Sequence, residues 1–225
     1  MNLPNGFSAA SCAAGLKSSG ALDLTLIVNN GPSFDAAAVY TSNQVVAAPV
    51  IWSKQVTKEK IVRAVILNSG GANACTGPQG FADTHQTAEH VGEVLGISSG
   101  EVVVCSTGLI GELLPMEKII AGINLISQEL SQNALQEIAS AIMTTDSVSK
   151  IANAKRESFE ISGVAKGAGM LAPALATMLS VVMTDAKLPE NAQEIFQRVC
   201  DRTYNRIDSD GCTSTYDTEI GRAHV

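Results

Sequence analysis

The chain has 225 residues, a formal net charge of −7 and a sequence pI of about 4.9. Hydrophobic residues make up 45% of it and charged residues 16%, a balance that excludes a disordered chain and favours a globular protein with an aliphatic core. The acidic charge argues against a nucleic-acid partner, and the lack of a long apolar run argues against a membrane partner, so we expect a cytoplasmic protein.

The first half of the chain is expected to alternate short strands with one long helix. Strands are predicted at residues 22–28 and 37–40, and a third at 62–67, where a β-branched apolar run stops at the sequence Asn-Ser-Gly-Gly. Apolar residues at helical spacing predict a helix over residues 78–95. The glycine-rich stretch between them is expected to be a tight turn, with the lining of a site as the alternative.

The second half continues the alternation of strands and helices. Strands are predicted at residues 101–104, 157–164 and 177–183, two helices within 116–143, and a last helix at 189–202. No Pro- or Ser-rich linker divides the chain. The pattern therefore predicts an α/β protein.

The five cysteines are odd in number and contain no Cys-x-x-Cys pair. A disulfide framework or a zinc site is not expected from this pattern, and reduced thiols are the default. We therefore predict no metal site.

The stretch from Lys166 to Leu179 is rich in glycine, alanine and proline and lies between two predicted strands. One interpretation is a phosphate-binding loop, because Gly167-x-Gly169-x-x-Ala172 loosely fits a dinucleotide fingerprint with Asp185 placed for a ribose. Pro173 and the strand that follows so soon argue against it. The other interpretation is a self-cleaving threonine.

A threonine hydroxyl needs an adjacent base to act as a nucleophile, and a free α-amino group on the same residue can be that base. The amine becomes free only when the preceding peptide bond is cut. Attack of the Thr177 hydroxyl on the Ala176 carbonyl would give an ester that water hydrolyses. Chemistry alone does not select this threonine from the others in the chain.

The stretch resembles the cleavage motif of the glutamate N-acetyltransferase / ornithine acetyltransferase (ArgJ) family, Lys-Gly-x-Gly-Met-x-x-Pro-x-x-Ala-Thr-Met-Leu, and keeps every fixed position. Other segments also resemble that family, namely residues 6–7, 13–17, 47–50, 68–77, 106–111, 143–146, 205–211 and 213–218. The resemblance implies a DmpA/ArgJ-like α/β fold of mixed sheets layered with helices, of the self-cleaving N-terminal-nucleophile type. It also implies cleavage between Ala176 and Thr177.

The resemblance implies a role for each matching residue. Thr177 would be the nucleophile and would also contact the substrate. Thr107 and Gly108 would stabilise the oxyanion that forms during acyl transfer. Lys166 and Thr144 would bind the substrate, and an ammonium suits an amino-acid carboxylate. The neighbouring Thr145 is an alternative to Thr144.

The family's reaction moves the acetyl group of N-acetylornithine to glutamate, in the cyclic pathway of arginine biosynthesis. The resemblance implies no cofactor, with acetyl-CoA as a possible second acetyl donor. An alpha chain of residues 1–176 and a beta chain beginning at Thr177 would assemble as a heterotetramer of two alpha and two beta chains. Related self-cleaving amidohydrolases or aminopeptidases, in which water replaces glutamate, are the alternative.

The family pattern stops at Thr218, and members of the family are much longer than this chain. Residues 219–225 resemble translated sequencing-adapter DNA, so we expect a non-native tail after a truncated beta chain of residues 177–218. A substrate-binding glutamate would then lie in the missing part. An inactive fragment is therefore a further hypothesis.

Overall fold

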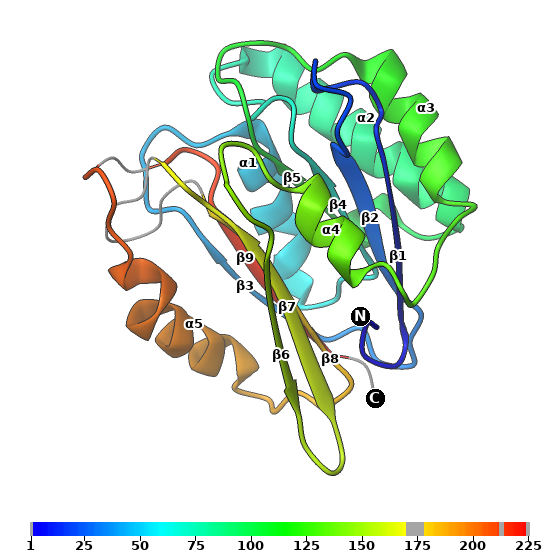
Figure 1. The fold of residues 1–225 in the computed structure, drawn as a ribbon, viewed down its shortest axis with the longest axis vertical. Coiled ribbons are helices and arrows are strands. Elements are labelled where there is room, and N and C mark those ends of the chain that lie inside the picture. Colours follow the sequence, from blue (N-terminus) through cyan, green and yellow to red (C-terminus); the bar gives the residue numbers. More distant parts are fainter. Residues whose placement is uncertain (1, 170–177, 212–213, 224–225) are drawn as a thin grey trace.

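The computed structural model describes residues 2–169, 178–211 and 214–223, apart from the side chains of 222 and 223. Two β-sheets face each other, with helices on their outer faces (Figure 1). None of the helices in the described ranges is long and apolar enough to cross a membrane.

The first sheet has the strand order β1-β2-β4-β5. Its strands are β1 (Phe7–Cys12), β2 (Leu24–Asn29), β4 (Ala64–Asn68) and β5 (Val102–Ser106). The pairs β1–β2 and β2–β4 are antiparallel, whereas β4 and β5 run parallel. Every residue of β4 and β5 is buried, as continuous apolar runs predict for strands covered on both faces.

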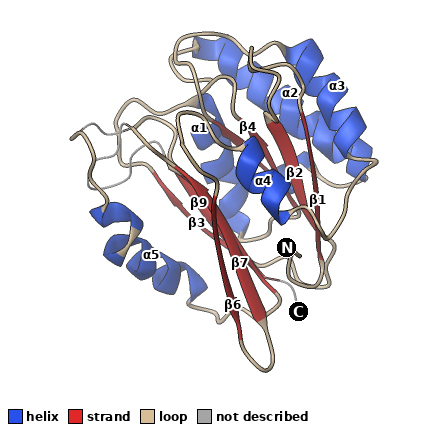
Figure 2. Ribbon diagram, in the orientation of Figure 1, coloured by secondary structure: helices blue, strands red, loops and turns tan. Residues whose placement is uncertain are grey.

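Three helices cover the outer side of this sheet (Figure 2). They are α1 (Ala48–Val56), α2 (Gly77–Leu95) and α3 (Met116–Ile126). Helix α2 is the crossover between the parallel strands β4 and β5, and it ends at Gly96 with a left-handed φ of 65°. Short 3₁₀ helices lie at Thr57–Glu59, Ser99–Glu101 and Tyr204–Arg206.

The second sheet has the order β3-β9-β8-β7-β6. Its strands are β3 (Ala36–Tyr40), β6 (Lys150–Lys155), β7 (Glu160–Lys166), β8 (Leu179–Thr184) and β9 (Thr218–Ala223). Only β8 and β9 pair in parallel. Helix α5 (Ala192–Arg202) packs against β3 on the outer side. Most of residues 219–225 lie in β9, and their non-native origin stays a prediction.

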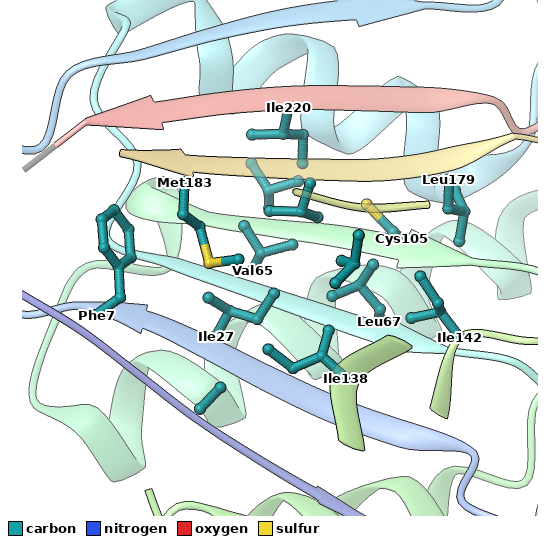
Figure 3. Close-up of a cluster of buried hydrophobic side chains, with 14 of the residues drawn as sticks. Phe7, Ile27, Val65, Leu67, Cys105, Ile138, Ile142, Leu179, Met183 and Ile220 are labelled. Atoms are coloured by element: carbon teal, nitrogen blue, oxygen red, sulfur yellow. The ribbon is translucent and has the colours of Figure 1, made fainter. Parts of the chain in front are cut away.

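The space between the sheets is filled by aliphatic side chains (Figure 3). Ile27, Val65 and Leu67 of the first sheet meet Leu179, Met183 and Ile220 of the second. Helix α4 (Leu135–Ala141) closes one end of this core with Leu135 and Ile138. Burial of each such side chain contributes about 1.5–3 kcal/mol to the free energy of folding. The core therefore fixes the strand ends that carry the candidate site.

The predicted α/β class is confirmed. Most of the predicted strands and helices begin and end within about three residues of the observed bounds, which is the usual uncertainty of predicted boundaries. The sequence did not predict β1, β6, β9 or α1.

Candidate active site

Lys166 lies at the end of β7 and is fully buried. Its ammonium donates hydrogen bonds to Oγ1 of Thr107, at 3.1 Å, and to Oγ1 of Thr144, at 2.6 Å. Thr107 follows β5 of the other sheet and Thr144 follows α4, so the lysine joins three parts of the fold. A buried charge destabilises a fold unless it is compensated, and such groups concentrate at functional sites.

The charge of Lys166 is balanced by two carboxylates. The pKa of the Lys166 ammonium is lowered to about 8, chiefly by burial and to a smaller extent by the nearby Lys150 and Lys17. Asp146 and Asp217 act in the opposite direction by stabilising the charged form. With a pKa of about 8, the ammonium is mostly protonated at neutral pH.

Asp146 holds the segments that carry Thr144 and Lys166. Its Oδ1 accepts a 2.8 Å hydrogen bond from the N–H of Gly167, and its Oδ2 accepts one of 3.2 Å from the N–H of Thr144. Burial acts to raise the pKa of Asp146, but the ammonium of Lys150 and the two N–H donors outweigh it, so the pKa lies below its ordinary value. Asp146 therefore stays ionised and keeps Thr144 beside Lys166.

The turn after β5 leaves no room for a side chain at Gly108. Its φ is 129°, and a Cβ there would lie 2.8 Å from the carbonyl carbon of Gly70 and from the nitrogen of Gly71. The turn is fixed further by the 2.9 Å hydrogen bond that the Thr107 N–H donates to the Asn68 carbonyl. Thr107 and Gly108 are thus held rigidly by the backbone of the glycine turn after β4, as a preorganised site requires.

A cavity of about 740 Å³ opens beside these residues. Gly108 and Thr144 contribute to its wall, together with Thr145, Lys17 and Gly70. This volume is in the range of small-molecule sites. The glycine turn after β4, for which the sequence favoured a purely structural role, therefore also lines the cavity.

The structure brings four of the predicted residues together: Thr107, Gly108, Thr144 and Lys166. Thr145 lines the same cavity, but the hydrogen bond from Lys166 goes to Thr144, which favours Thr144 as the substrate contact. Ala176 and Thr177 lie outside the described residues. The dinucleotide interpretation is wrong, because β7 and β8 are antiparallel neighbours and not the parallel strands of a βαβ unit.

Asp217 is a site residue that sequence reasoning missed. Its Oδ1 accepts a 2.7 Å hydrogen bond from the N–H of Met178, the residue after Thr177. Asp217 and Asp146 both lie in segments that resemble the family, and this was their only signal in the sequence.

The model of the ArgJ family matches residues 8–224. The chain belongs to the ArgJ family. The "Arginine biosynthesis bifunctional protein ArgJ" of Streptomyces coelicolor is 56% identical over 216 residues, which are 96% of this chain and 56% of that protein. The protein of the same name from Mycobacterium tuberculosis is 54% identical over 226 residues, with the same two shares. The chain thus spans about half the length of the curated relatives it matches.

Solved structures agree with this family. The M. tuberculosis ornithine acetyltransferase, solved in complex with ornithine, has 50% sequence identity and a TM-score of 0.67, and the match covers 76% of this chain and 92% of that one. ArgJ of Bacillus halodurans has 34% identity and a TM-score of 0.65, with shares of 77% and 93%. An L-aminopeptidase from Ochrobactrum anthropi, at 12% identity and a TM-score of 0.55, shares the fold, described as a variant of the Ntn hydrolase fold. The DmpA/ArgJ-like fold class is confirmed.

Proposed function

We propose that this chain carries the catalytic centre of an acetyltransferase that moves the acetyl group of N-acetylornithine to glutamate. One observation carries the proposal: the buried Lys166 ammonium donates hydrogen bonds to Thr107 and to Thr144, and Thr144 and Gly108 line a cavity sized for a small molecule. The names of the relatives and the ornithine bound to the M. tuberculosis protein support an amino-acid substrate.

The hydrogen bonds of Lys166 orient the two threonines for binding. An ammonium can only donate, so Oγ1 of Thr107 is the acceptor in its pair with Lys166 and its own O–H is free to donate elsewhere. The cation behind the oxygen strengthens that donor by polarising it. Thr107 can thus donate through its side chain, and Gly108 through its backbone N–H, to the oxyanion of acyl transfer.

The nucleophile of this proposal is Thr177. Its hydroxyl first attacks the carbonyl of Ala176, and water hydrolyses the resulting ester, which frees the α-amine of Thr177. That amine then takes the hydroxyl proton as the oxygen attacks the acetyl carbonyl of N-acetylornithine. Ornithine leaves with a proton on its amine, and the amine of glutamate attacks the acetyl ester to give N-acetylglutamate.

The lengths of the relatives support a divided chain. The match to the solved M. tuberculosis chain covers 92% of that chain but only 76% of this one, so the solved chain is the shorter of the two. The curated M. tuberculosis protein, in contrast, is longer than this chain. This difference fits a protein divided into two chains. An alpha–beta heterotetramer, and acetyl-CoA as a second donor in line with the "bifunctional" name, belong to the same proposal.

The test is acetyl transfer by the gene product that contains these residues. With N-acetylornithine and glutamate present, we expect ornithine and N-acetylglutamate in equal amounts. Thr144→Val should raise KM about tenfold, the effect of one lost hydrogen bond of about 1.4 kcal/mol, because it removes the hydroxyl that Lys166 orients. Thr145→Val, in the same cavity wall, should change KM little. Release of acetate without N-acetylglutamate would overturn the proposal in favour of an amidohydrolase.

A further inference from the structure

Asp217 is completely buried, and in the described structure only one of its two carboxylate oxygens accepts a hydrogen bond. The residue is 0% exposed and lies directly before β9. Its Oδ1 accepts the Met178 N–H at 2.7 Å, whereas within the described part of the chain its Oδ2 has no hydrogen-bond partner, although the Ser214 hydroxyl lies close enough to lower its pKa. Buried carboxylate oxygens normally have partners, so such a group calls for a functional explanation.

The position of Asp217 follows from the pairing of the two parallel strands of the second sheet, β8 and β9. Parallel pairing places Thr218 opposite Leu179, and the N–H of Thr218 donates a 3.1 Å hydrogen bond to the carbonyl of Met178. The residue before β9 is thereby held against the residue before β8. Met178 is bound on both its N–H and its C=O, and its nitrogen is covalently attached to the carbonyl carbon of Thr177.

Groups of both charge signs surround Asp217 and shift its pKa in opposite directions. The pKa of Asp217 is raised to about 7, chiefly by burial and also by the neighbouring Glu219, against the opposing effects of the Met178 N–H, the Ser214 hydroxyl and the Lys166 ammonium. Above this pH the ionised Asp217 helps Lys166 to keep its proton. The carboxylate therefore supports the same ammonium that orients Thr107 and Thr144.

We propose that Asp217 is a positioning residue of the acetyl-transfer centre, which fixes the backbone after the nucleophile through Met178 and supports the Lys166 ammonium with its charge. The inference rests on the proposed function.

Asp217→Asn tests this directly, because the amide oxygen can still accept the Met178 N–H while the charge is lost. We expect kcat to fall on the order of 10²-fold, the size of effect that the loss of one preorganised electrostatic interaction causes. We also expect the alkaline limb of the kcat profile to move about one pH unit lower, because Lys166 loses a neighbouring anion. Asp217→Glu, which keeps the charge but displaces the oxygens, should lower kcat and leave the alkaline limb in place.

Asp185→Asn is the matched control. Asp185 stands at the other end of β8 and likewise accepts a backbone N–H, from Glu160 at 2.6 Å. We expect kcat and its pH profile to stay as in the unaltered protein. A cooperative thermal unfolding transition shows that each variant is folded. If Asp217→Asn does not fold, the pH profile of Asp217→Glu tests the role of Asp217 instead.

Failure of the inference about Asp217 can be distinguished from failure of the proposed function. If the unaltered protein transfers acetyl but the Asp217→Asn profile coincides with the Asp185→Asn profile, the role of Asp217 is overturned alone. A shift of the alkaline limb in Asp217→Glu as well would also overturn it, because that variant keeps the charge. If the unaltered protein shows no transfer, the proposed function falls and this inference with it.

Discussion

The ammonium of Lys166 donates a 3.1 Å hydrogen bond to Oγ1 of Thr107, across the boundary between the two sheets. Lys166 ends β7 and Thr107 follows β5, so the contact exists only when the sheets are packed together. The aliphatic core between the sheets therefore sets the geometry of the candidate site. A change that loosens this core should disturb the site even at a distance from it.

Lys166→Met should reduce acetyl transfer by on the order of 10²-fold, because it removes the cation that orients and polarises Thr107 and Thr144. In the unaltered protein the rate should fall as the pH rises through about 8, since the Lys166 pKa is about 8 and the neutral amine no longer polarises the two threonine hydroxyls. The variant should lack this alkaline limb. Steady-state rates between pH 6 and 10 check both points.

Lys155→Met is the control for that measurement, because Lys155 is an exposed lysine of β6 with an ion pair to Glu160 at 3.8 Å. Its profile should match the unaltered protein. An alkaline limb that persists in Lys166→Met would contradict the assignment of that limb to Lys166.

Gly108→Ala should lower the rate of acetyl transfer by about 10²–10³, the effect of losing one oxyanion donor. The added Cβ would lie 2.8 Å from backbone atoms of Gly70 and Gly71, so the turn must move and carry the N–H away. Gly111→Ala is the matched control, because its φ of 89° imposes similar backbone strain while nothing lies within 4 Å of the added carbon. Equal losses in both variants would mean that strain, and not the position of the N–H, causes the effect.

Glu219→Val should stabilise the protein. Glu219 is fully buried in β9, and neither of its carboxylate oxygens has a hydrogen-bond partner in the described structure, although the Cys200 thiol is its close neighbour. Burial raises the pKa of Glu219 to about 7, from an ordinary value of 4.5. The folded state thus binds the proton more tightly than the unfolded state, and stability falls as the pH rises from about 4.5 through 7.

The gain from Glu219→Val should be about 3 kcal/mol in the free energy of unfolding at pH 8 and should shrink toward pH 4. Urea unfolding at both pH values measures it. Glu219→Gln should remove the pH-dependent part while it leaves a buried polar group without a partner. A gain that grows toward pH 4 would show that Glu219 is not the cause.

The parts of the fold with a local signal were predictable from the sequence. The apolar runs of β4 and β5 and the helical spacing of α2 lie within single segments, so they were found. Strand β6 has the sequence Lys-Ile-Ala-Asn-Ala-Lys and is mostly exposed, so it exists because it pairs with β7 and not because of its own pattern. Helix α1 begins with Pro49 in its first turn and has a short apolar pattern, which gave no comparable signal.

The residues of the candidate site could be predicted from the sequence, but the contacts among them could not. Family resemblance pointed to Thr107, Gly108, Thr144 and Lys166, and the structure places them together. The bonds from Met178 to Asp217 and from Gly167 to Asp146 span 39 and 21 residues of sequence and depend on how strands and loops meet. No local pattern encodes such distances, and these carboxylates were therefore missed as site residues.

The central claim is that Thr177 becomes a free N-terminal residue and carries the acetyl group. Intact-mass measurement of the purified gene product, before and after incubation with N-acetylornithine alone, tests it most directly. We predict two chains, one ending at Ala176 and one beginning at Thr177, with the mass of one acetyl group added to the second chain only. We predict a single unmodified chain for Thr177→Ala. An uncut wild-type protein that still transfers acetyl, or an acetyl group on any other residue, would contradict the claim.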